Sequence, residues 1–476
     1  MRFSLPRQFP AVILCLAIAV PAGAAAHWTI YRGNAQRTGN TDGNAGPDAP
    51  KVLWAYKAKD HFIASPVPEG DRLFISGVGA FNVSTFYCLS TDPKPAKREL
   101  WTKTTPYLKL PTVSSPAVVK GKLIFGDGMH QTDDAILHCL SMDKGLPLWQ
   151  LPVVGKLVHL EGSPTIVGSK VYIGGGAAGV LCVDLDRVSL GGKEQSLAAI
   201  QKILDKKWQE LLAKYEIEKK KDPDLAVPPS VDQLPKPAPK RLWQVGQKKW
   251  HVDAPVTVAG QRVLVASAYL DKEKVGDRAL ICLDAKTGKQ QWRTPLKLNP
   301  WGGASVLDDT VVVGGSTIGY DTKVLTGAKG ELVALNLKDG KVKWRKTVPG
   351  GIVSCVALAG DVAIATATDG KVRAFDLAKG LRRWIYDGGK THFFAPPAVA
   401  GGVVYAGDLK GVIHAVNLAD GQRKWTLDLG TSPEVKAPGM FYAGPLVQGG
   451  RLYAATCNLE GPNAQQETVV VCVGAK

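Results

Sequence analysis

The chain has 476 residues, of which 45% are hydrophobic and 21% are charged, and its formal net charge is +17. This length exceeds that of one ordinary domain, and the hydrophobic content excludes an intrinsically disordered chain. The 52 glycines and 31 prolines exclude a mainly helical protein and favour many short strands joined by turns.

Residues 1–26 have the pattern of a secretory signal peptide. Arg2 and Arg7 precede the apolar run AVILCLAIAV, which is too short to cross a bilayer, and the small residues PAGAAA follow it. We therefore expect an exported protein, periplasmic, secreted or at the cell surface, without a transmembrane segment in the mature chain. Removing the two arginines leaves 57 basic residues against 42 acidic ones, a net charge of +15 that favours anionic polymers as partners. We do not expect a nucleic-acid partner.

One phrase recurs along the rest of the chain. It reads ICLDAKTGKQQWRTP at Ile281 and returns at Leu332, Val372 and Ile413, with degraded copies at Phe86 and Leu137. The tryptophans that end the copies are spaced 47, 48, 94, 49, 52, 40 and 41 residues apart: Trp54, Trp101, Trp149, Trp243, Trp292, Trp344, Trp384 and Trp425. The spacing of 94 corresponds to one period plus an insertion. With this insertion included, we assign the repeat to residues 27–476.

Each unit is predicted to contain four short antiparallel strands. A phrase such as SSPAVVKGKLIFG at Ser114 supplies the first two strands, and the recurring phrase supplies the third and fourth. The turn between the last two strands carries an Asx residue that can accept backbone N–H groups and a glycine that can adopt the left-handed conformation: Asp284, Asn336, Asp376 and Asn417 with Gly288, Gly340, Gly380 and Gly421. Radial repetition of such units predicts an all-β protein, an eight-bladed β-propeller. The last copy stops after its third strand, so we expect KVLWAYKA at Lys51 to complete it and close the ring.

Five cysteines occupy one position in the third strand of their units: Cys88, Cys139, Cys182, Cys282 and Cys472. Other units place Ala334, Ala374 and Ala415 there, so the position requires a small apolar side chain. Because whole sheets separate equivalent positions, we expect buried thiols without disulfides among them. The repeated cysteine therefore does not indicate a redox site.

Residues 189–240 form the insertion, which we place within blade three. Six apolar residues recur there at helical spacing, and a proline-rich return follows: Leu197, Ile200, Leu204, Trp208, Leu211 and Tyr215. The apolar face either packs on the side of the propeller or belongs to an arm that docks a partner.

Four histidines precede the innermost strands of their blades, in loops that border the central funnel of a propeller. Together with neighbouring acidic and aromatic residues they form a candidate site for an anionic or planar ligand: His61, His159, Glu161, Trp250, His251, Asp253, Trp301, His392, Phe393 and Phe394. We predict no metal site, since no two histidines share a close sequence spacing. On the same face, His130, Asp133 and Asp134 belong either to an oxygen-rich cation site or to a solvated turn.

The repeat resembles that of the pyrroloquinoline-quinone-like (PQQ-like) propeller superfamily, and HWTIYRGNAQRTGN at His27 resembles the lead-in of such propellers. One branch contains the quinoprotein dehydrogenases, which bind the quinone and Ca²⁺ over the axis. The other contains noncatalytic propellers, such as the periplasmic scaffold of the outer-membrane assembly machinery. The resemblance to the first branch implies a pair of adjacent cysteines and a Glu–Asn–Asp set for Ca²⁺. The chain has no Cys-Cys pair and no C-x-x-C-H.

We therefore interpret the chain as a noncatalytic, monomeric binding or scaffold propeller of the cell envelope. Its partner is expected to be an envelope protein or an anionic polymer, with no catalytic residues and no cofactor. The alternative is a PQQ-dependent dehydrogenase that uses the quinone and Ca²⁺.

Overall fold

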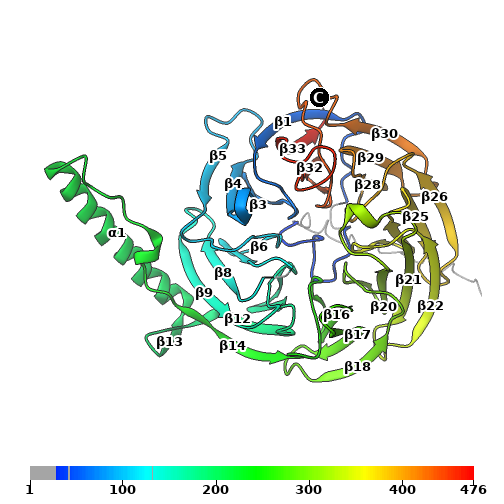
Figure 1. Ribbon diagram of the computed structural model, residues 1–476, viewed down its shortest axis with the longest axis horizontal. Coiled ribbons are helices and arrows are strands. Elements are labelled where there is room, and N and C mark those ends of the chain that lie inside the picture. Colours follow the sequence, from blue (N-terminus) through cyan, green and yellow to red (C-terminus); the bar gives the residue numbers. More distant parts are fainter. Residues whose placement is uncertain (1–27, 41–42, 131, 476) are drawn as a thin grey trace, which may run out of the picture.

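The structure is a computed structural model that describes residues 28–40, 43–130 and 132–475. Eight separate antiparallel sheets surround a central axis (Figure 1), so the predicted eight-bladed propeller is confirmed. The predicted signal peptide lies outside the described residues.

The strands of each blade follow one another from the axis outward. Blade one contains β2 (Val67–Glu69), β3 (Arg72–Val78), β4 (Ser84–Ser90) and β5 (Glu99–Lys103). Blade two contains β6 (Ala117–Val119), β7 (Lys122–Gly126), β8 (Ala135–Ser141) and β9 (Pro147–Val153). Blade three contains β10 (Thr165–Val167), β11 (Lys170–Gly174), β12 (Val180–Leu190), the short β13 (Lys193–Ser196) and β14 (Ala238–Val245). Blade four contains β15 (Thr257–Ala259), β16 (Arg262–Leu270), β17 (Val275–Asp284) and β18 (Gln290–Pro295).

The second half of the ring repeats this pattern. Blade five contains β19 (Ala304–Leu307), β20 (Thr310–Ser316), β21 (Lys329–Asn336) and β22 (Val342–Pro349). Blade six contains β23 (Ala357–Ala359), β24 (Val362–Thr366), β25 (Lys371–Asp376) and β26 (Arg382–Asp387). Blade seven contains β27 (Ala398–Ala400), β28 (Val403–Gly407), β29 (Val412–Asn417) and β30 (Arg423–Asp428). Short 3₁₀ turns lie in the described connections: η1 (Ala80–Asn82), η2 (Val231–Gln233) and η3 (Thr322–Val324).

Blade eight joins the two ends of the chain. It contains β31 (Leu446–Gln448), β32 (Arg451–Ala455) and β33 (Thr468–Gly474), and β1 (Lys51–Ala58) is its outer strand. β1 runs antiparallel to β33, with Trp54 opposite Cys472. The predicted closure by the N-terminal strand is therefore confirmed, and the ring has no open sheet at the junction.

Where the next blade has a glycine in the turn between its third and fourth strands, the tryptophan of a blade packs on that turn. We call such blades regular. The indole N–H of the tryptophan donates to the backbone carbonyl that follows the Asx residue of the neighbouring turn, as Trp344 does to Leu377 at 2.9 Å. The turn glycine lies against the ring: Gly380 has a φ of 65°, and a Cβ there would lie 2.5 Å from Trp344 Cδ2. The same contacts join four more pairs: Trp243 with Gly288, Trp292 with Gly340, Trp384 with Gly421, and Trp101 with Gly145, where Ser141 takes the place of the Asx residue. The predicted turns therefore also form the contact surface between blades.

The repeated small residue in the third strand has a direct structural reason. In each blade it lies opposite the tryptophan of the fourth strand, as Cys282 does to Trp292 and Ala334 to Trp344. A larger side chain would compete with the indole for this buried space. The seven cysteines that the structure describes are all buried and free, as expected for this packing role.

The insertion forms α1 (Leu197–Lys221), which extends away from the disc (Figure 1). Its first half packs on the propeller: Leu197, Ile200 and Leu204 are buried in one cluster with Trp149 of blade two. Trp208 and Leu211 cover the same cluster, whereas Ile217 near the far end is exposed. Of the two interpretations, packing on the propeller thus describes the first half of the helix. No helix in the described part of the chain has both the length and the hydrophobicity of a transmembrane span.

The segment that precedes β1 lies across the inner ends of the blades. Its carbonyl oxygens accept backbone N–H groups from the innermost strands of five blades: Thr29 from Val118, Ala35 from Val258, Gln36 from Val306, Thr38 from Leu358 and Gly39 from Val399. Because these inner strands have no other neighbour on the axis side, the segment satisfies donors that would otherwise lack protein partners.

Packing between the turn glycine and the indole can be tested with two left-handed glycines. Gly340 has a φ of 70° and lies against Trp292, whereas Gly260 has a φ of 57° and no atom within 4 Å of the position its Cβ would take. Gly340→Ala and Gly260→Ala should each lower the free energy of unfolding by about 1 kcal/mol, because alanine is strained at a positive φ. Gly340→Ala should lose about 1–3 kcal/mol more, because Trp292 must move. Urea denaturation followed by tryptophan fluorescence measures both, and equal losses would contradict the packing role.

Closure of the ring can be tested at Trp54, which is 6% exposed and carries the Arg98 guanidinium 4.3 Å above its ring. Trp54→Ala should lower the unfolding free energy by about 3–5 kcal/mol, as expected for a buried tryptophan. Leu381→Ala, at a side chain that is 59% exposed, is the control and should change it by less than about 0.5 kcal/mol. A loss at Trp54 no larger than at Leu381 would mean that β1 does not stabilise the ring.

Candidate functional site

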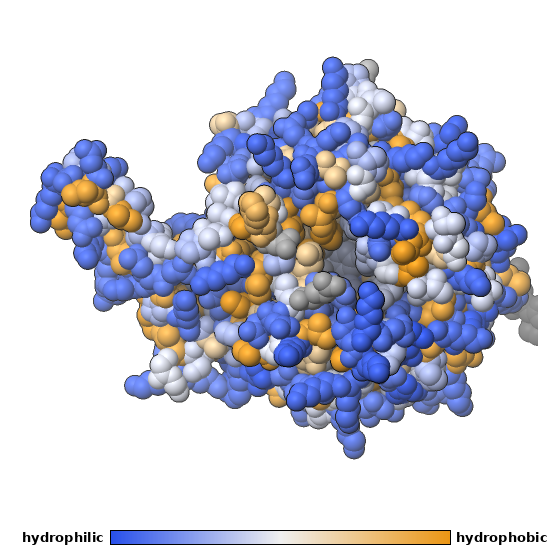
Figure 2. All heavy atoms as spheres, viewed as in Figure 1, coloured by the Kyte–Doolittle hydropathy of each residue, from blue (hydrophilic) through white to orange (hydrophobic). Residues whose placement is uncertain are grey.

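A cavity of about 540 Å³ lies on the propeller axis. Its walls come from the loops that precede the innermost strands and from the loops between the second and third strands. The loops that precede the innermost strands form short antiparallel bridges with the ends of the second strands, such as His61 with Val78 of β3 and His251 with Ala268 of β16. Figure 2 shows a hollow near the centre of the disc, with both hydrophobic and hydrophilic side chains around it.

Serines and one tyrosine line the base of the cavity. The Ser65 N–H donates to Ser115 Oγ at 2.8 Å, and the Ser115 N–H donates to Ser163 Oγ at 3.0 Å, so a chain of hydrogen bonds links three blades. Tyr31 also lines the cavity, and its carbonyl accepts from Arg37. Arg37 is fully buried and donates to the Ser163 and Val256 carbonyls. Burial lowers the pKa of Arg37 to about 10.

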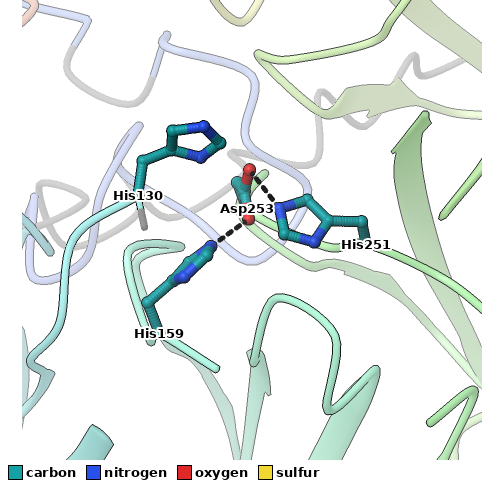
Figure 3. A group of neighbouring side chains, drawn as sticks. All are labelled: His130, His159, His251 and Asp253. Carbon is teal, nitrogen blue, oxygen red and sulfur yellow. Dashed lines mark hydrogen bonds and ion pairs between the residues drawn. The ribbon is translucent and has the colours of Figure 1, made fainter. Parts of the chain in front are cut away.

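Three histidines and one aspartate converge at one side of the cavity (Figure 3). His130 comes from the loop between β7 and β8, His159 from the loop before β10, and His251 and Asp253 from the loop before β15. Asp253 lies between two imidazoles, with Oδ1 2.8 Å from His159 Nε2 and Oδ2 3.0 Å from His251 Nε2. One potential ligand atom from each of the four residues lies within 4.8 Å of the others.

The electrostatics of this cluster follow from burial and from mutual contact. Burial opposes the charged form of His159, but the carboxylate of Asp253 outweighs it and raises the pKa of His159 to about 9. Burial alone would raise the pKa of Asp253, yet His251 and His159 hold it well below its ordinary value. Glu161 behaves differently: burial, and then the charge of Asp253, raise the pKa of its carboxyl. The environment therefore favours the charged form at Asp253 and the neutral form at Glu161.

The structure separates the ten predicted site residues into two groups. Glu161, Asp253 and Trp301 line the cavity, and His159 and His251 contact Asp253. The other five belong to packing or to loop hydrogen bonds: His61, Trp250, His392, Phe393 and Phe394.

Several cavity residues, and the proximity of three histidines, were not predicted from the sequence. Tyr31, Tyr320 and Glu460 line the cavity from segments outside the repeated phrases, so no repeat pattern marked them. Spacing along the chain was also an unsuitable criterion for a metal site, because the propeller brings together loops from three blades. Asp133 and Asp134 accept N–H groups from Leu157 and Gly155, which fits the solvated turn rather than a cation site.

The cluster of His130, His159, His251 and Asp253 does not fit the calcium site of a quinoprotein dehydrogenase. Ca²⁺ takes six to eight oxygen ligands. The cluster of metal-ligating side chains found among the described residues contains three imidazoles and one carboxylate. In the cavity, Glu460 accepts from Tyr442 and from the Thr322 N–H, and Asp321 accepts from the Lys323 N–H.

A sequence model of the family described as outer membrane protein assembly factor BamB matches residues 46–208, 230–323 and 314–461. The chain belongs to this family. BamB of Burkholderia pseudomallei is 31% identical over 149 residues, which cover 31% of this chain and 33% of the relative. The matched part of the chain thus spans about a third of that BamB relative.

Solved structures share the fold at low identity. BamB from Moraxella catarrhalis matches with a TM-score of 0.56 and 14% identity, covering 90% of this chain and 98% of that one. Quinohemoprotein alcohol dehydrogenase from Comamonas testosteroni matches with a TM-score of 0.62 and 13% identity, covering 95% of this chain and 81% of that one. Because both groups share the propeller, the structural likeness does not separate a BamB-type scaffold from a dehydrogenase.

Asp253 is predicted to stabilise the loops that meet at the cluster. Asp253→Asn places an amide N–H₂ against one of two buried histidines, and breaking such a buried pair should lower the unfolding free energy by about 3 kcal/mol. Urea denaturation in the presence of a chelator measures the loss. Asp321→Asn, at an exposed carboxylate of the same cavity, should change the free energy by less than about 0.5 kcal/mol. Similar values for the two variants would show that Asp253 has no special role.

Proposed function

We propose that this propeller is a noncatalytic scaffold of the cell envelope that binds a protein partner during outer membrane protein assembly. The observation that carries the proposal is membership in the BamB family over most of the chain. The leader-like residues 1–26 support export.

The face that bears the cavity supports a protein partner. Several loops on this face expose large apolar side chains to solvent: Phe81, Val83, Val154, Tyr320, Val324 and Leu459. They come from blades one, two, five and eight, so the exposed apolar side chains are distributed around the axis and are not confined to one loop. Phe81 is fully exposed at the tip of the loop between β3 and β4. Apolar groups that gather on one face are typical of protein-binding surfaces.

The rival function is a PQQ-dependent dehydrogenase. The absence of adjacent cysteines from the sequence and the nitrogen-rich cluster among the described residues both favour the scaffold. Purified protein mixed with the quinone and Ca²⁺ should show no dye reduction with alcohols or sugars. Turnover that depends on the quinone would replace the scaffold proposal with the dehydrogenase.

The scaffold role is tested by genetic complementation. Cells that lack the chain should contain smaller amounts of outer membrane proteins, and fractionation should place the chain in the envelope. The wild type should restore these amounts, whereas Phe81→Ser combined with Tyr320→Ser should restore them less, because the docking face loses apolar contact area. Quantitative mass spectrometry of outer membranes measures the effect.

Leu381 provides the matched control. It is 59% exposed in the turn between β25 and β26, on the face opposite the cavity. Leu381→Ser should complement like the wild type at equal expression. Full complementation by the double variant would contradict docking through the cavity face. Unchanged outer membranes in cells lacking the chain would contradict the scaffold role itself.

A further inference from the structure

We propose that His130, His159, His251 and Asp253 form a Zn²⁺ site at the side of the axial cavity. Three imidazoles and one carboxylate from three separate loops offer ligand atoms within 4.8 Å of one another (Figure 3). Imidazole nitrogen and carboxylate oxygen are ligands that Zn²⁺ prefers, and four is its usual coordination number. This inference does not depend on the proposed scaffold role.

The hydrogen bonding of the cluster indicates that a cation belongs there. His251 is fully buried, and neither of its ring nitrogens has a hydrogen-bond partner, although Nε2 lies 3.0 Å from Asp253 Oδ2. His159 is also fully buried, and its Nδ1 lacks a partner. Buried polar groups are normally satisfied, so His251 Nε2, which faces the Asp253 carboxylate at 3.0 Å without a hydrogen bond, requires an explanation. An ion among the four residues would displace a ring proton, accept the Nε2 lone pairs of His159 and His251, and take Asp253 as a further ligand.

The position of the cluster allows an ion to enter. His130 and Asp253 line the cavity, whereas His159 and His251 are fully buried behind it. His130 is the exposed member of the set, and it would complete the coordination from the cavity side. Glu161 lies next to the cluster, with Oε1 4.0 Å from His159 Nε2 and without a hydrogen-bond partner. Its carboxyl can therefore accept a hydrogen bond from a water molecule bound near the ion.

The ligand set selects against the other common divalent ions. Ca²⁺ and Mg²⁺ require mostly oxygen ligands, and this cluster offers one carboxylate. We therefore expect Zn²⁺ to bind and Ca²⁺ not to compete. Co²⁺ commonly replaces Zn²⁺ and reports its coordination through visible absorption, so it serves as the spectroscopic probe.

The experiment uses the full mature chain after dialysis against EDTA. Isothermal titration should show one equivalent of Zn²⁺ with a dissociation constant below about 1 µM, and Zn²⁺ should raise the melting temperature. Co²⁺ should give the absorption bands of a four-coordinate site, which Zn²⁺ bleaches and excess Ca²⁺ leaves unchanged. His130→Ala should weaken Zn²⁺ binding at least about tenfold, and because His130 is exposed this variant is expected to fold.

Two further variants separate loss of a ligand from loss of structure. His251→Gln should abolish the Co²⁺ spectrum, with circular dichroism verifying that the sheets persist. His392→Gln changes a histidine at the equivalent place of blade seven, outside the cluster, and should bind Zn²⁺ like the wild type. The proposal is overturned if the folded wild type binds no stoichiometric Zn²⁺. It is also overturned if His130→Ala and His251→Gln bind as tightly as the wild type, because the ion would then lie elsewhere.

Discussion

The ring depends on one contact that is repeated from blade to blade: a tryptophan on the outer strand packed against the tight turn of its neighbour. The indole N–H satisfies a turn carbonyl, and the left-handed glycine allows the ring to approach the backbone. The contact therefore demands a tryptophan, a glycine and an Asx residue or a serine in every regular unit. It also demands a small residue opposite the tryptophan, which Cys282 and Ala334 supply. These requirements account for the repeated phrase without any catalytic role.

The irregular blades show what happens when the turn is missing. Trp54 faces blade one, whose turn has no glycine, and Arg98 stacks on its ring instead. Trp149 faces blade three, where the insertion replaces the turn, and α1 covers it with Leu197 and Ile200. Trp425 faces blade eight, where the chain ends meet, and its N–H donates to the Pro47 carbonyl at 2.8 Å. Helix α1 and the N-terminal segment thus replace the contact between a tryptophan and the turn of the next blade where that turn is missing.

The radial arrangement of the blades also brings the residues of the axial cavity together. Because the blades surround one axis, the loops before their inner strands face a common space, and the N-terminal segment closes its base with Tyr31 and the buried Arg37. The loops can vary without disturbing the contacts between blades, since the tryptophans and turns lie on the outer strands. A family of scaffolds and a family of enzymes can therefore share the fold and differ in the cavity.

The sequence by itself determined the number of blades, the closing strand and the burial of the cysteines, because each depends on a local pattern that repeats at a regular period. Glu161, Asp253 and Trp301, which the sequence predicts at the mouth of the funnel, line the cavity. Only the tertiary structure decided that His159, His251 and Asp253 meet His130, while Phe393 and Phe394 turn into the packing between blades. Loop residues at equivalent positions face either the axis or a neighbouring blade, and that choice depends on contacts between segments far apart in the chain. No spacing along the sequence records those contacts.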